Sequence, residues 1–347
     1  EPDVIRNQSG SPYKVFTPFW KACCAATEPH LPRPAPKQLR PFDRILPSAN
    51  LDDWQLLPTN PNWATGIAAT WQPGEQSAHQ RLQQFVNESM ADYKEGRDRP
   101  DKSLTSRLSP YLHFGEITPR QIWHVVQPYL DRADHEAGAR CFLSEIGWRE
   151  FSYHLLFHFS DFPEQPFRKN FLSFPWVKND EALERWQLGQ TGYPMVDAGM
   201  RELWHTGWMH NRIRMIAASF LVKHLLIHWQ AGETWFWDTL VDADLASNSA
   251  SWQWVAGCGA DAAPYFRIFN PITQGQKFDP DGAYVKQWIP EIAQLSTKYI
   301  HAPWQAPAQE LKDAGVKLGD NYPEPIVDHS EARQRALAAF EQAKKVA

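Results

Sequence analysis

TGYPMVDAGMRELWHTGWMHNRIRM (191–215), VDADLASNSASWQW (241–254) and APYFRIFNP (263–271) lie close together in this chain and decide its fold. They combine three tryptophans (Trp208, Trp252 and Trp254) with two closely spaced aspartates (Asp242 and Asp244) and a cluster of Asn and Arg. A packed core alone does not require this mixture, because buried positions are mostly apolar. A site that holds a large aromatic cofactor, with something flat beside it, would require it.

The bulk composition sets wide limits on what the chain can be. Its 347 residues suffice for one large domain or two. The net charge of −5 excludes a general attraction to nucleic acid or to an anionic membrane, so any contact with DNA needs a local basic patch. The 17 tryptophans are too many for core filling alone, and we expect some of them to stack on a ligand.

The four cysteines, Cys23, Cys24, Cys141 and Cys258, form no CxxC motif and no disulfide framework. This usage indicates a reducing compartment, and we predict a cytoplasmic protein. No apolar run is long enough to span a bilayer, and no signal peptide is visible, so no membrane partner is expected.

The chain divides into a proline-rich arm and a helical domain. Residues 1–64 contain segments such as PHLPRPAPKQLRP (29–41) and are predicted to form an extended linker or arm that packs over a neighbouring surface. From Glu75 the apolar residues recur with helical spacing. Helices are predicted from 75 onward and over 118–130, 138–159, 194–206 and 209–228, and no useful strand pattern appears. The prediction is therefore an all-α, irregular multi-helix domain over 65–347.

Two of these helices carry polar faces that are neither plain core nor plain surface. In the helix 209–228, Asn211 and Met215 lie off the apolar stripe. In the helix 138–159, Glu145, Trp148 and Arg149 share a face with one another. Glu145 and Arg149 could form a surface salt bridge around Trp148. The same face could instead line a cavity in which the Trp148 ring stacks on a flat ligand.

Three further motifs have less specific interpretations. The hydroxyls of TSRLS (105–109) suit a phosphate at a helix start, but also a simple N-cap. HLLFH (154–158) and HLLIH (224–228) have the spacing of a zinc motif without its glutamate, so packed histidines are expected and no metal is predicted. No Ser-His-Asp or Cys-His arrangement is visible, and a cofactor is expected to supply the chemistry.

The motifs together resemble the FAD-binding catalytic domain of the DNA photolyase/cryptochrome family, and most of all the class I-like bacterial photolyases of cyclobutane pyrimidine dimers. The resemblance covers residues 12 to about 330, in family order. It is carried by PYKVFTPFW (12–20), TSRLSPYLHFG (105–115), SEIGWREF (144–151), the segment 191–223, DADLASNSASWQW (242–254) and DAAPYFRIFNP (261–271).

The resemblance implies a role for each matching residue. The positions implied to bind FAD are Tyr93, Thr105, Ser106, Leu108, Ser109, Arg149, Trp208, Arg214, Asp242, Asp244 and Asn248, with Arg214 paired to Asp242 and Asn248 facing flavin N5. The lesion pocket is implied to contain Glu145, Trp148, Asn211, Met215 and Trp254. DNA-backbone contacts fall on Arg97, Arg212 and Gln274, and the tryptophan chain that photoreduces the flavin on Trp252, Trp229 and Trp176.

The implied activity is light-driven repair of UV-damaged DNA. Excited, fully reduced FAD donates an electron to a flipped-out dimer, the cyclobutane bonds break, and the electron returns. Relatives carry an N-terminal α/β domain before PYKVFTPFW that helps to bind an antenna chromophore. It is missing from this sequence, so no antenna chromophore is expected here, the missing domain is a candidate partner, and a monomer is expected.

Three alternatives stay open at this stage. A cryptochrome-like blue-light photoreceptor would signal through a partner, although Asn248 fits the photolyase type better than the acidic residue of plant-type cryptochromes. Repair of (6-4) photoproducts would call for histidines where Asn211 and Met215 stand. A catalytic fragment that is inactive without its missing domain is the third alternative.

Overall fold

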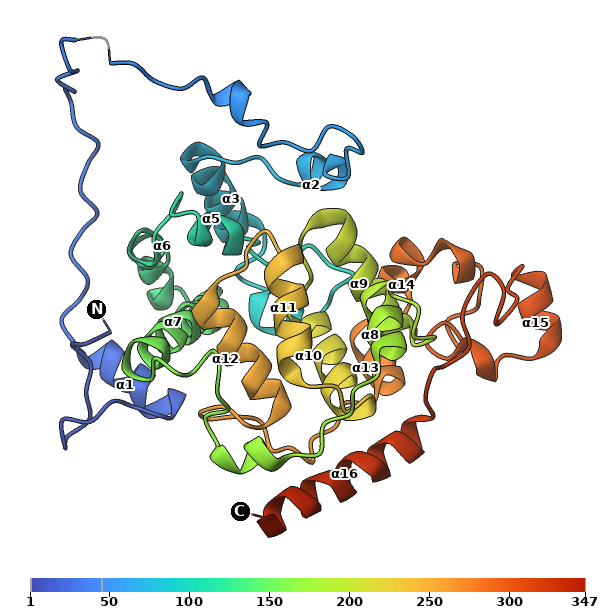
Figure 1. Cartoon of the computed structure of the whole chain (residues 1–347). Helices are drawn as coiled ribbons and strands as arrows, with labels where there is room; N and C mark the ends of the chain where they lie inside the picture. Colours follow the sequence, from blue (N-terminus) through green and yellow to red (C-terminus); the bar gives the residue numbers. More distant parts are fainter. Residues whose placement is uncertain (1, 45, 347) are drawn as a thin grey trace.

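The computed structural model describes residues 2–44 and 46–346, and the all-α prediction is confirmed for them (Figure 1). The only β pairing in the described part is an isolated bridge between Leu318 and Tyr322. The helices are α1 (Phe16–Ala25), α2 (Thr65–Thr70), α3 (Glu75–Glu88), α4 (Tyr93–Gly96), α5 (Ser109–His113), α6 (Pro119–Val126), α7 (Glu136–His158), α8 (Asp180–Gln187), α9 (Pro194–Thr206), α10 (Asn211–Ser219), α11 (Trp229–Thr239), α12 (Leu245–Ala256), α13 (Pro271–Phe278), α14 (Ala283–Trp288), α15 (Ala308–Asp313) and α16 (His329–Val346). Short helical turns are η1 (Leu51–Trp54), η2 (Gln127–Asp131), η3 (Lys169–Ser173), η4 (Phe220–His224), η5 (Pro290–Ile292) and η6 (Pro303–Gln305).

Helices α9 to α12 form the centre of the molecule and share the largest apolar cluster. Helix α9 ends as predicted at Thr206, since Gly207 adopts a left-handed φ of 66° and a Cβ there would meet Val241. The helix predicted over 209–228 is shorter in the structure. It begins at Asn211, because the His210 side chain accepts a hydrogen bond from the Arg212 N–H, and it widens into a π turn at η4 that stops at His224.

A second apolar cluster holds α3, α6 and α7 together. Helix α6 starts with a capping box between Thr118 and Gln121, so the predicted start at Thr118-Pro119 is confirmed. The predicted helix over 138–159 is α7, which begins two residues earlier and ends one residue earlier. Helix α7 is the longest in the described chain and lies against both α12 and α4, so it joins the two clusters.

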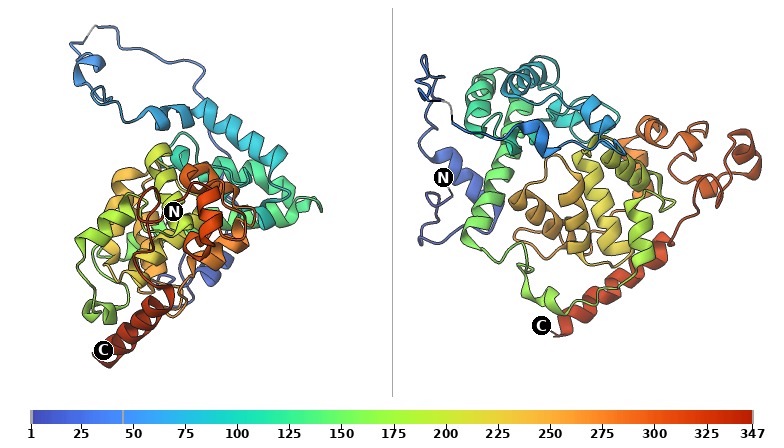
Figure 2. Two further views of the ribbon diagram at one scale, coloured as in Figure 1. Left: turned by 90° about the vertical axis from the view of Figure 1, so that its right-hand side faces the viewer. Right: turned by 45° about the horizontal axis from the view of Figure 1, so that its top comes forward.

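The proline-rich arm is extended for most of its length, but it contains one helix that the sequence analysis did not predict. Helix α1 packs on α7 through Phe16 and Phe19. Gly147 makes this approach possible, because a Cβ there would lie 2.5 Å from the Trp20 ring. After α1 the chain runs out from the body and returns at α2, as Figure 2 shows. Large apolar side chains along this excursion are exposed: Leu31, Leu39, Phe42, Leu46, Leu51, Trp54, Leu56, Leu57 and Trp63.

The two HxxxH motifs hold chain segments rather than forming a metal cluster. The His154 ring accepts a hydrogen bond from the Tyr13 N–H (3.0 Å) and contacts the Pro2 carbonyl, so it anchors the N-terminal segment on α7. His224 Nε2 lies 2.8 Å from His329 Nδ1, which anchors the start of α16. No group of three or more potential metal ligands occurs among the described residues. None of the helices described there has the length and apolar character needed to cross a bilayer.

Candidate cofactor and substrate site

The loop that leads into α5 is held from behind by an aromatic ring. Trp208 Nε1 donates a hydrogen bond to Ser109 Oγ (3.3 Å), and the Arg107 guanidinium lies 4.4 Å from the Trp208 ring centre. Arg107 has a left-handed φ of 51°, which is uncommon for a residue with a side chain. Thr105 and Ser106 lie half-buried in this loop, where their hydroxyls are available for an anion.

Tyr93 and Leu108 support the same loop from the core. Leu108 is buried, and the Tyr93 ring packs edge-on against Phe85 and Phe142 at 5.3 and 5.5 Å. Burial raises the pKa of the Tyr93 hydroxyl, so it stays protonated as a hydrogen-bond donor. Both residues therefore belong to the apolar cluster on which the loop rests.

Arg214 and Asp242 form the ion pair that the resemblance implied. Arg214 Nη2 donates to Asp242 Oδ2 at 2.8 Å, and Arg214 Nε donates to the Met209 carbonyl at 2.7 Å. The other carboxylate oxygen, Asp242 Oδ1, is buried with no hydrogen-bond partner among the described residues. Buried acceptors are almost always satisfied, so this oxygen fits a donor supplied by a bound group.

Asp244 is tied to the face of α7 that carries Arg149. Its Oδ1 accepts the Ser247 N–H (2.8 Å) and so caps α12. Its Oδ2 accepts a hydrogen bond from the Tyr153 hydroxyl, which in turn accepts from Arg149 Nη2 at 3.3 Å. The sequence analysis missed Tyr153, although its i+4 spacing from Arg149 places the two on one helical face.

Asn248 is oriented by α11, through Glu233, a residue that sequence reasoning missed. Asn248 Nδ2 donates to the Glu233 carbonyl (3.0 Å), and Ser249 Oγ donates to Glu233 Oε1 (2.5 Å). Burial raises the pKa of the Glu233 carboxyl from 4.5 to about 7. No sequence signal identifies this contact, because it joins side chains of two different helices.

Glu145 and Trp148 already have partners on the substrate side of α7. Arg97 Nη1 donates a hydrogen bond to Glu145 Oε1, which joins a predicted DNA contact to a predicted lesion contact. The Trp148 ring is stacked on Phe16 of α1, with ring centres 3.8 Å apart and planes 10° apart. One face of this indole is therefore covered by the protein.

The remaining substrate candidates lie on α10, α12 and α13. Asn211 Nδ2 lies 4.0 Å from Met215 Sδ, so the two side chains are neighbours. Arg212 is paired with Asp98 at 2.7 Å and lies over the Phe278 ring of α13. Trp254 is half-buried against the central cluster, and Gln274 has a buried, unpaired Oε1. No hydrogen bond or ring contact between described residues joins Trp254 or Gln274 to the other substrate candidates.

The three predicted electron-transfer tryptophans lie along α12, α11 and the segment before α8. Trp252 and Trp229 are buried in the central cluster, and Trp176 is half-buried beside it. The His228 ring lies between the last two, 5.5 Å from Trp229 and 5.1 Å from Trp176. The Trp252 ring has its own neighbours in Trp186 and Phe236, at 6.2 and 5.0 Å.

A buried polar network beneath α10 was also missed. The Glu202 carboxylate accepts hydrogen bonds from the Tyr284 hydroxyl (2.7 Å) and the His210 N–H (3.3 Å), and lies 3.7 Å from Arg107. Burial raises the pKa of Glu202 and lowers that of His210 to about 4. The network fixes the turn from which Asn211 projects.

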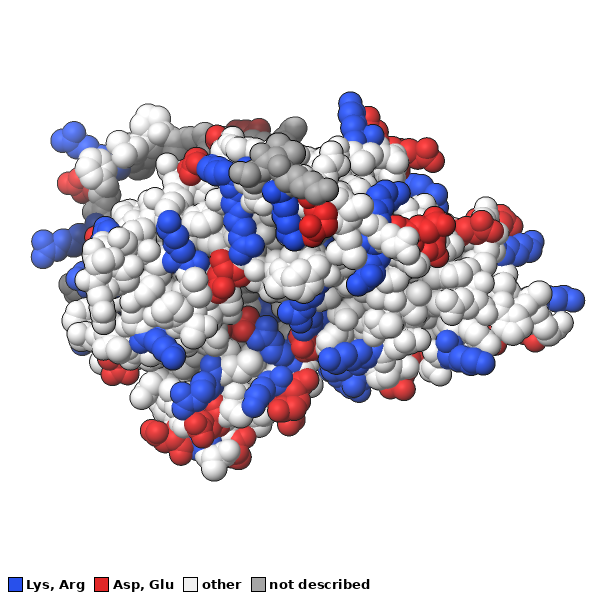
Figure 3. Space-filling model, turned by 90° about the horizontal axis from the view of Figure 1, so that it is seen from below, with Lys and Arg blue, Asp and Glu red and all other residues white. Residues whose placement is uncertain are grey.

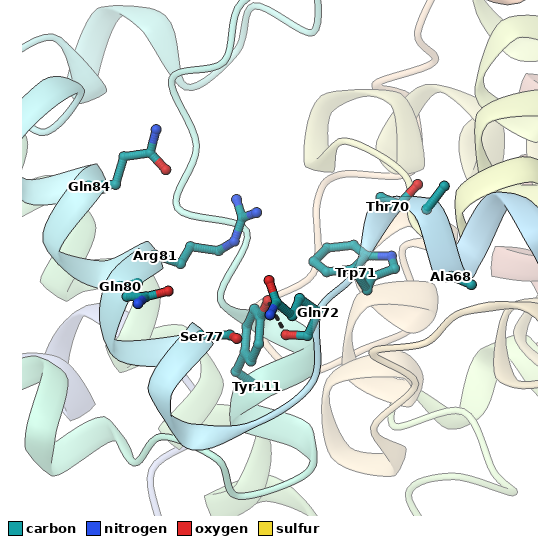
Figure 4. Close-up of a pocket in the computed structure, with 10 residues that line it drawn as sticks. Ala68, Thr70, Trp71, Gln72, Ser77, Gln80, Arg81, Gln84 and Tyr111 are labelled. Atoms are coloured by element: carbon teal, nitrogen blue, oxygen red, sulfur yellow. Dashed lines mark hydrogen bonds between the residues drawn. The ribbon is translucent and has the colours of Figure 1, made fainter.

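One surface pocket lies outside the predicted site. A polar pocket of about 480 Å³ opens between α2 and α3 (Figure 4). Arg81, Gln80 and Gln84 line it on one side and Trp71 on the other. The Tyr111 hydroxyl, which also lines it, donates a hydrogen bond to the Gln72 carbonyl. The pocket contains none of the predicted site residues. Seen from below, Lys and Arg side chains gather around a hollow near the middle of the face (Figure 3). An acidic chain thus has local basic surface.

Comparison with known proteins identifies the family. Residues 142–342 match the family described as the FAD binding domain of DNA photolyase. The deoxyribodipyrimidine photo-lyase of Agrobacterium fabrum is 53% identical over 346 residues, which cover 99% of this chain and 72% of that protein. Cryptochrome-1 of Arabidopsis thaliana is 39% identical over 351 residues, and the chain spans only 51% of its length.

A solved structure gives the same result for the fold. The crystal structure of a bacterial class III photolyase from Agrobacterium tumefaciens superposes with a TM-score of 0.96 at 52% identity, covering 99% of this chain and 71% of that one. That protein is described as class III, whereas the sequence motifs resembled the class I-like group; both are photolyases. The chain therefore belongs to the DNA photolyase/cryptochrome family, and its FAD-binding domain is the helical body formed around α7 and α9 to α12.

Proposed function

We propose that this chain repairs cyclobutane pyrimidine dimers in DNA by a light-driven reaction that uses FAD. Its likeness to enzymes named deoxyribodipyrimidine photo-lyase supports this enzyme class. One observation carries the proposal most directly. Helix α10 presents Arg214, paired with the half-satisfied Asp242, within one turn of Asn211 and Met215. A single rigid element thus holds a cofactor contact beside a substrate contact.

Several residues would hold the cofactor. Thr105, Ser106 and Ser109 would bind its phosphates, Asp242 and Asp244 would accept hydrogen bonds along its ring system and ribityl chain, and Asn248 would lie near the ring nitrogen N5. Bound FAD, when reduced and excited by light, supplies the electron. The protein excludes water and supplies fixed dipoles around that transfer.

Glu145 would meet the base edge of the dimer. A carbonyl oxygen can only accept a hydrogen bond, so Glu145 must carry a proton to donate one. Arg97 Nη1 now donates a hydrogen bond to Glu145 Oε1. Movement of Arg97 to a DNA phosphate would free the Glu145 carboxyl to meet the base edge. Trp148, backed by Phe16, and Trp254 would pack against the extruded pyrimidines.

The test is direct repair by the chain loaded with FAD. The flavin is reduced, an oligonucleotide with one thymine dimer is added, and samples are illuminated in the flavin absorption band or kept dark. Light-dependent loss of dimers is expected. Glu145→Gln should keep the flavin and slow repair. Retention of flavin by the parent without any light-dependent loss of dimers would refute the proposal.

A photoreceptor role is the second candidate, because the chain is also similar to plant cryptochromes. The two roles differ at the substrate, since a photoreceptor needs a partner protein rather than a lesion. Light-dependent change in flavin absorption without dimer repair would favour it. The monomeric state, the cytoplasmic location, an α/β domain as a partner and the lack of an antenna chromophore stay predictions.

A further inference from the structure

A groove of about 960 Å³ lies between α1, α4 and α7, outside the residues assigned to the lesion. Its charged lining consists of Lys21 on α1, Lys94 on α4, and Arg140 and Glu136 on α7. Glu136 is paired with Arg140 across one helical turn at 2.9 Å, in an exposed position. Three cations against one carboxylate make this a local basic surface on a chain of net charge −5.

The groove lies next to the proposed substrate site. Cys141 lines the groove, and its Sγ accepts from Arg97 Nη1 at 3.5 Å. The same Arg97 nitrogen binds Glu145, one helical turn further along α7. The groove therefore adjoins, at Cys141, the ion pair that joins the predicted phosphate and lesion contacts.

The helix geometry gives the distance from the lesion. The α7 residues that line the groove are Glu136, Ala137, Arg140, Cys141 and Ser144. At about 1.5 Å per residue, the charged ones, Arg140 and Glu136, lie about 7–14 Å along the axis from Glu145. Successive nucleotides of one strand are about 3.4 Å apart along the DNA axis. The groove thus corresponds to about two to four nucleotides beyond the dimer.

We propose that this groove binds the backbone of the damaged strand beside the dimer, with Lys21, Lys94 and Arg140 contacting its phosphates. The proposal rests on the dimer-repair function. Cations along a groove that lies next to a base-binding pocket suit a strand whose phosphates follow the extruded nucleotide. The Trp20 ring, held by Phe16 and Trp123, adds an aromatic surface to the same lining.

Salt dependence of binding tests the phosphate contacts. A variant with Lys21→Ala, Lys94→Ala and Arg140→Ala is compared with the parent for a duplex with one thymine dimer, at several salt concentrations. The slope of log affinity against log salt should fall by about 2 to 3, with at least a roughly tenfold loss of affinity near 0.1 M salt. The control variant, Lys298→Ala, Lys312→Ala and Lys317→Ala, removes three charges around α15, far from α1 (Figure 1), and should keep the slope. An unchanged slope in the groove variant, or an equal fall in the control, overturns the proposal.

A substrate without flanks separates this proposal from the function on which it rests. Parent and groove variant should both repair a thymine dimer dinucleotide in the light, because that substrate does not reach the groove. Loss of dinucleotide repair in the groove variant, with flavin retained, would assign the groove residues to the lesion pocket and overturn the strand contact. Failure of the parent on both the dinucleotide and the duplex would instead refute dimer repair itself.

Cys24 supplies an independent measurement, because it lines the groove and is exposed. Dimer duplexes carry a disulfide-activated tether on one phosphate, at positions from one to ten nucleotides on either side of the lesion. The Cys24 thiolate attacks the tether disulfide, forms a new S–S bond and releases a small thiol. Crosslinking should peak about two to four nucleotides from the dimer on one side and disappear in Cys24→Ser. Equal crosslinking at all positions, or none while the duplex still binds, overturns the proposal.

Discussion

Replacement of Glu233 by Gln tests whether the titration of one carboxyl changes the stability of the protein at the helix pair that orients Asn248. Glu233 is largely buried between α11 and α12 and accepts a hydrogen bond from Ser249 Oγ at 2.5 Å. Glutamine preserves the size of the side chain and an oxygen acceptor, but it removes the titration. The variant therefore isolates the charge from the packing.

The magnitude follows from the raised pKa of Glu233, about 7 in the folded protein against 4.5 in the unfolded chain. Between these pH values the folded state holds more protons on this group. The free energy of unfolding must therefore fall as pH rises through the window, and the loss is complete above about pH 7. The full shift corresponds to about 3.4 kcal/mol at 1.36 kcal/mol per unit, and solvent screening of this partly exposed group reduces it to about 1–2 kcal/mol.

The assay is urea unfolding of parent and variant at pH 5 and pH 8. Glu233→Gln should be more stable than the parent by about 1–2 kcal/mol at pH 8, and most of that gain should be absent at pH 5. Glu184→Gln, on the exposed side of α8, serves as the control and should be neutral at both pH values. A gain of equal size at both pH values, or a loss at pH 8, would refute the reasoning.

Three other predictions address the cofactor, the core and the C-terminal helix. Asp242→Asn should weaken FAD binding roughly 10–100-fold, because it removes the charged partner of Arg214, an interaction of about 1.5–3 kcal/mol. The amount of flavin released on dilution measures this loss, and unchanged flavin retention would contradict the role of Asp242 in the cofactor site. Lys223 is buried, and burial lowers its pKa to about 7. Between about pH 7 and 10.5 the folded state therefore binds fewer protons than the unfolded chain, so the stability of the parent should rise with pH in this range. Lys223→Met should abolish this rise in a pH series of unfolding curves, and a rise that persists would show that another group causes it. His329→Ala should speed proteolysis at the start of α16 several-fold, since the buried His224 ring loses its 2.8 Å partner, and equal cleavage rates would count against this anchor.

The helical fold was predictable because its signals are local. The pattern around 194–206 and the glycine that follows it set both the helix and its end, and Thr118-Pro119 set the start of α6. The end of α10 was not predictable in this way. Apolar spacing continues through HLLIH, but the backbone widens at η4 and Leu226 takes a left-handed φ of 54°. At this break α16 packs on η4 and Arg335 donates a hydrogen bond to the His224 carbonyl, a tertiary contact that no local pattern contains.

The candidate site was likewise predictable in part: its residues could be named in advance, but their tertiary contacts could not. Spacing alone left Asp242 and Asp244 without a role, and the resemblance to the family implied one. The structure adds the physical partners, Arg214 for the first and Tyr153 for the second. Phe16, behind the Trp148 ring, lies 132 positions away in the sequence and was assigned to an extended arm. Contacts of this kind follow from tertiary packing, so a single sequence does not reveal them.

The ion pair between Arg97 and Glu145 has a consequence for how damaged DNA is told from intact DNA. Each side chain is partly buried, with 20% and 31% of its surface exposed, and each neutralises the other. A passing stretch of intact DNA offers a phosphate to Arg97 but no extruded base to Glu145, so drawing Arg97 away would leave the partly buried Glu145 carboxyl without its hydrogen-bond partner, which is unfavourable. A dimer offers both groups at once and satisfies both residues. The pair would thus penalise binding to undamaged strands, and the enzyme would gain selectivity for lesions without reading any base sequence.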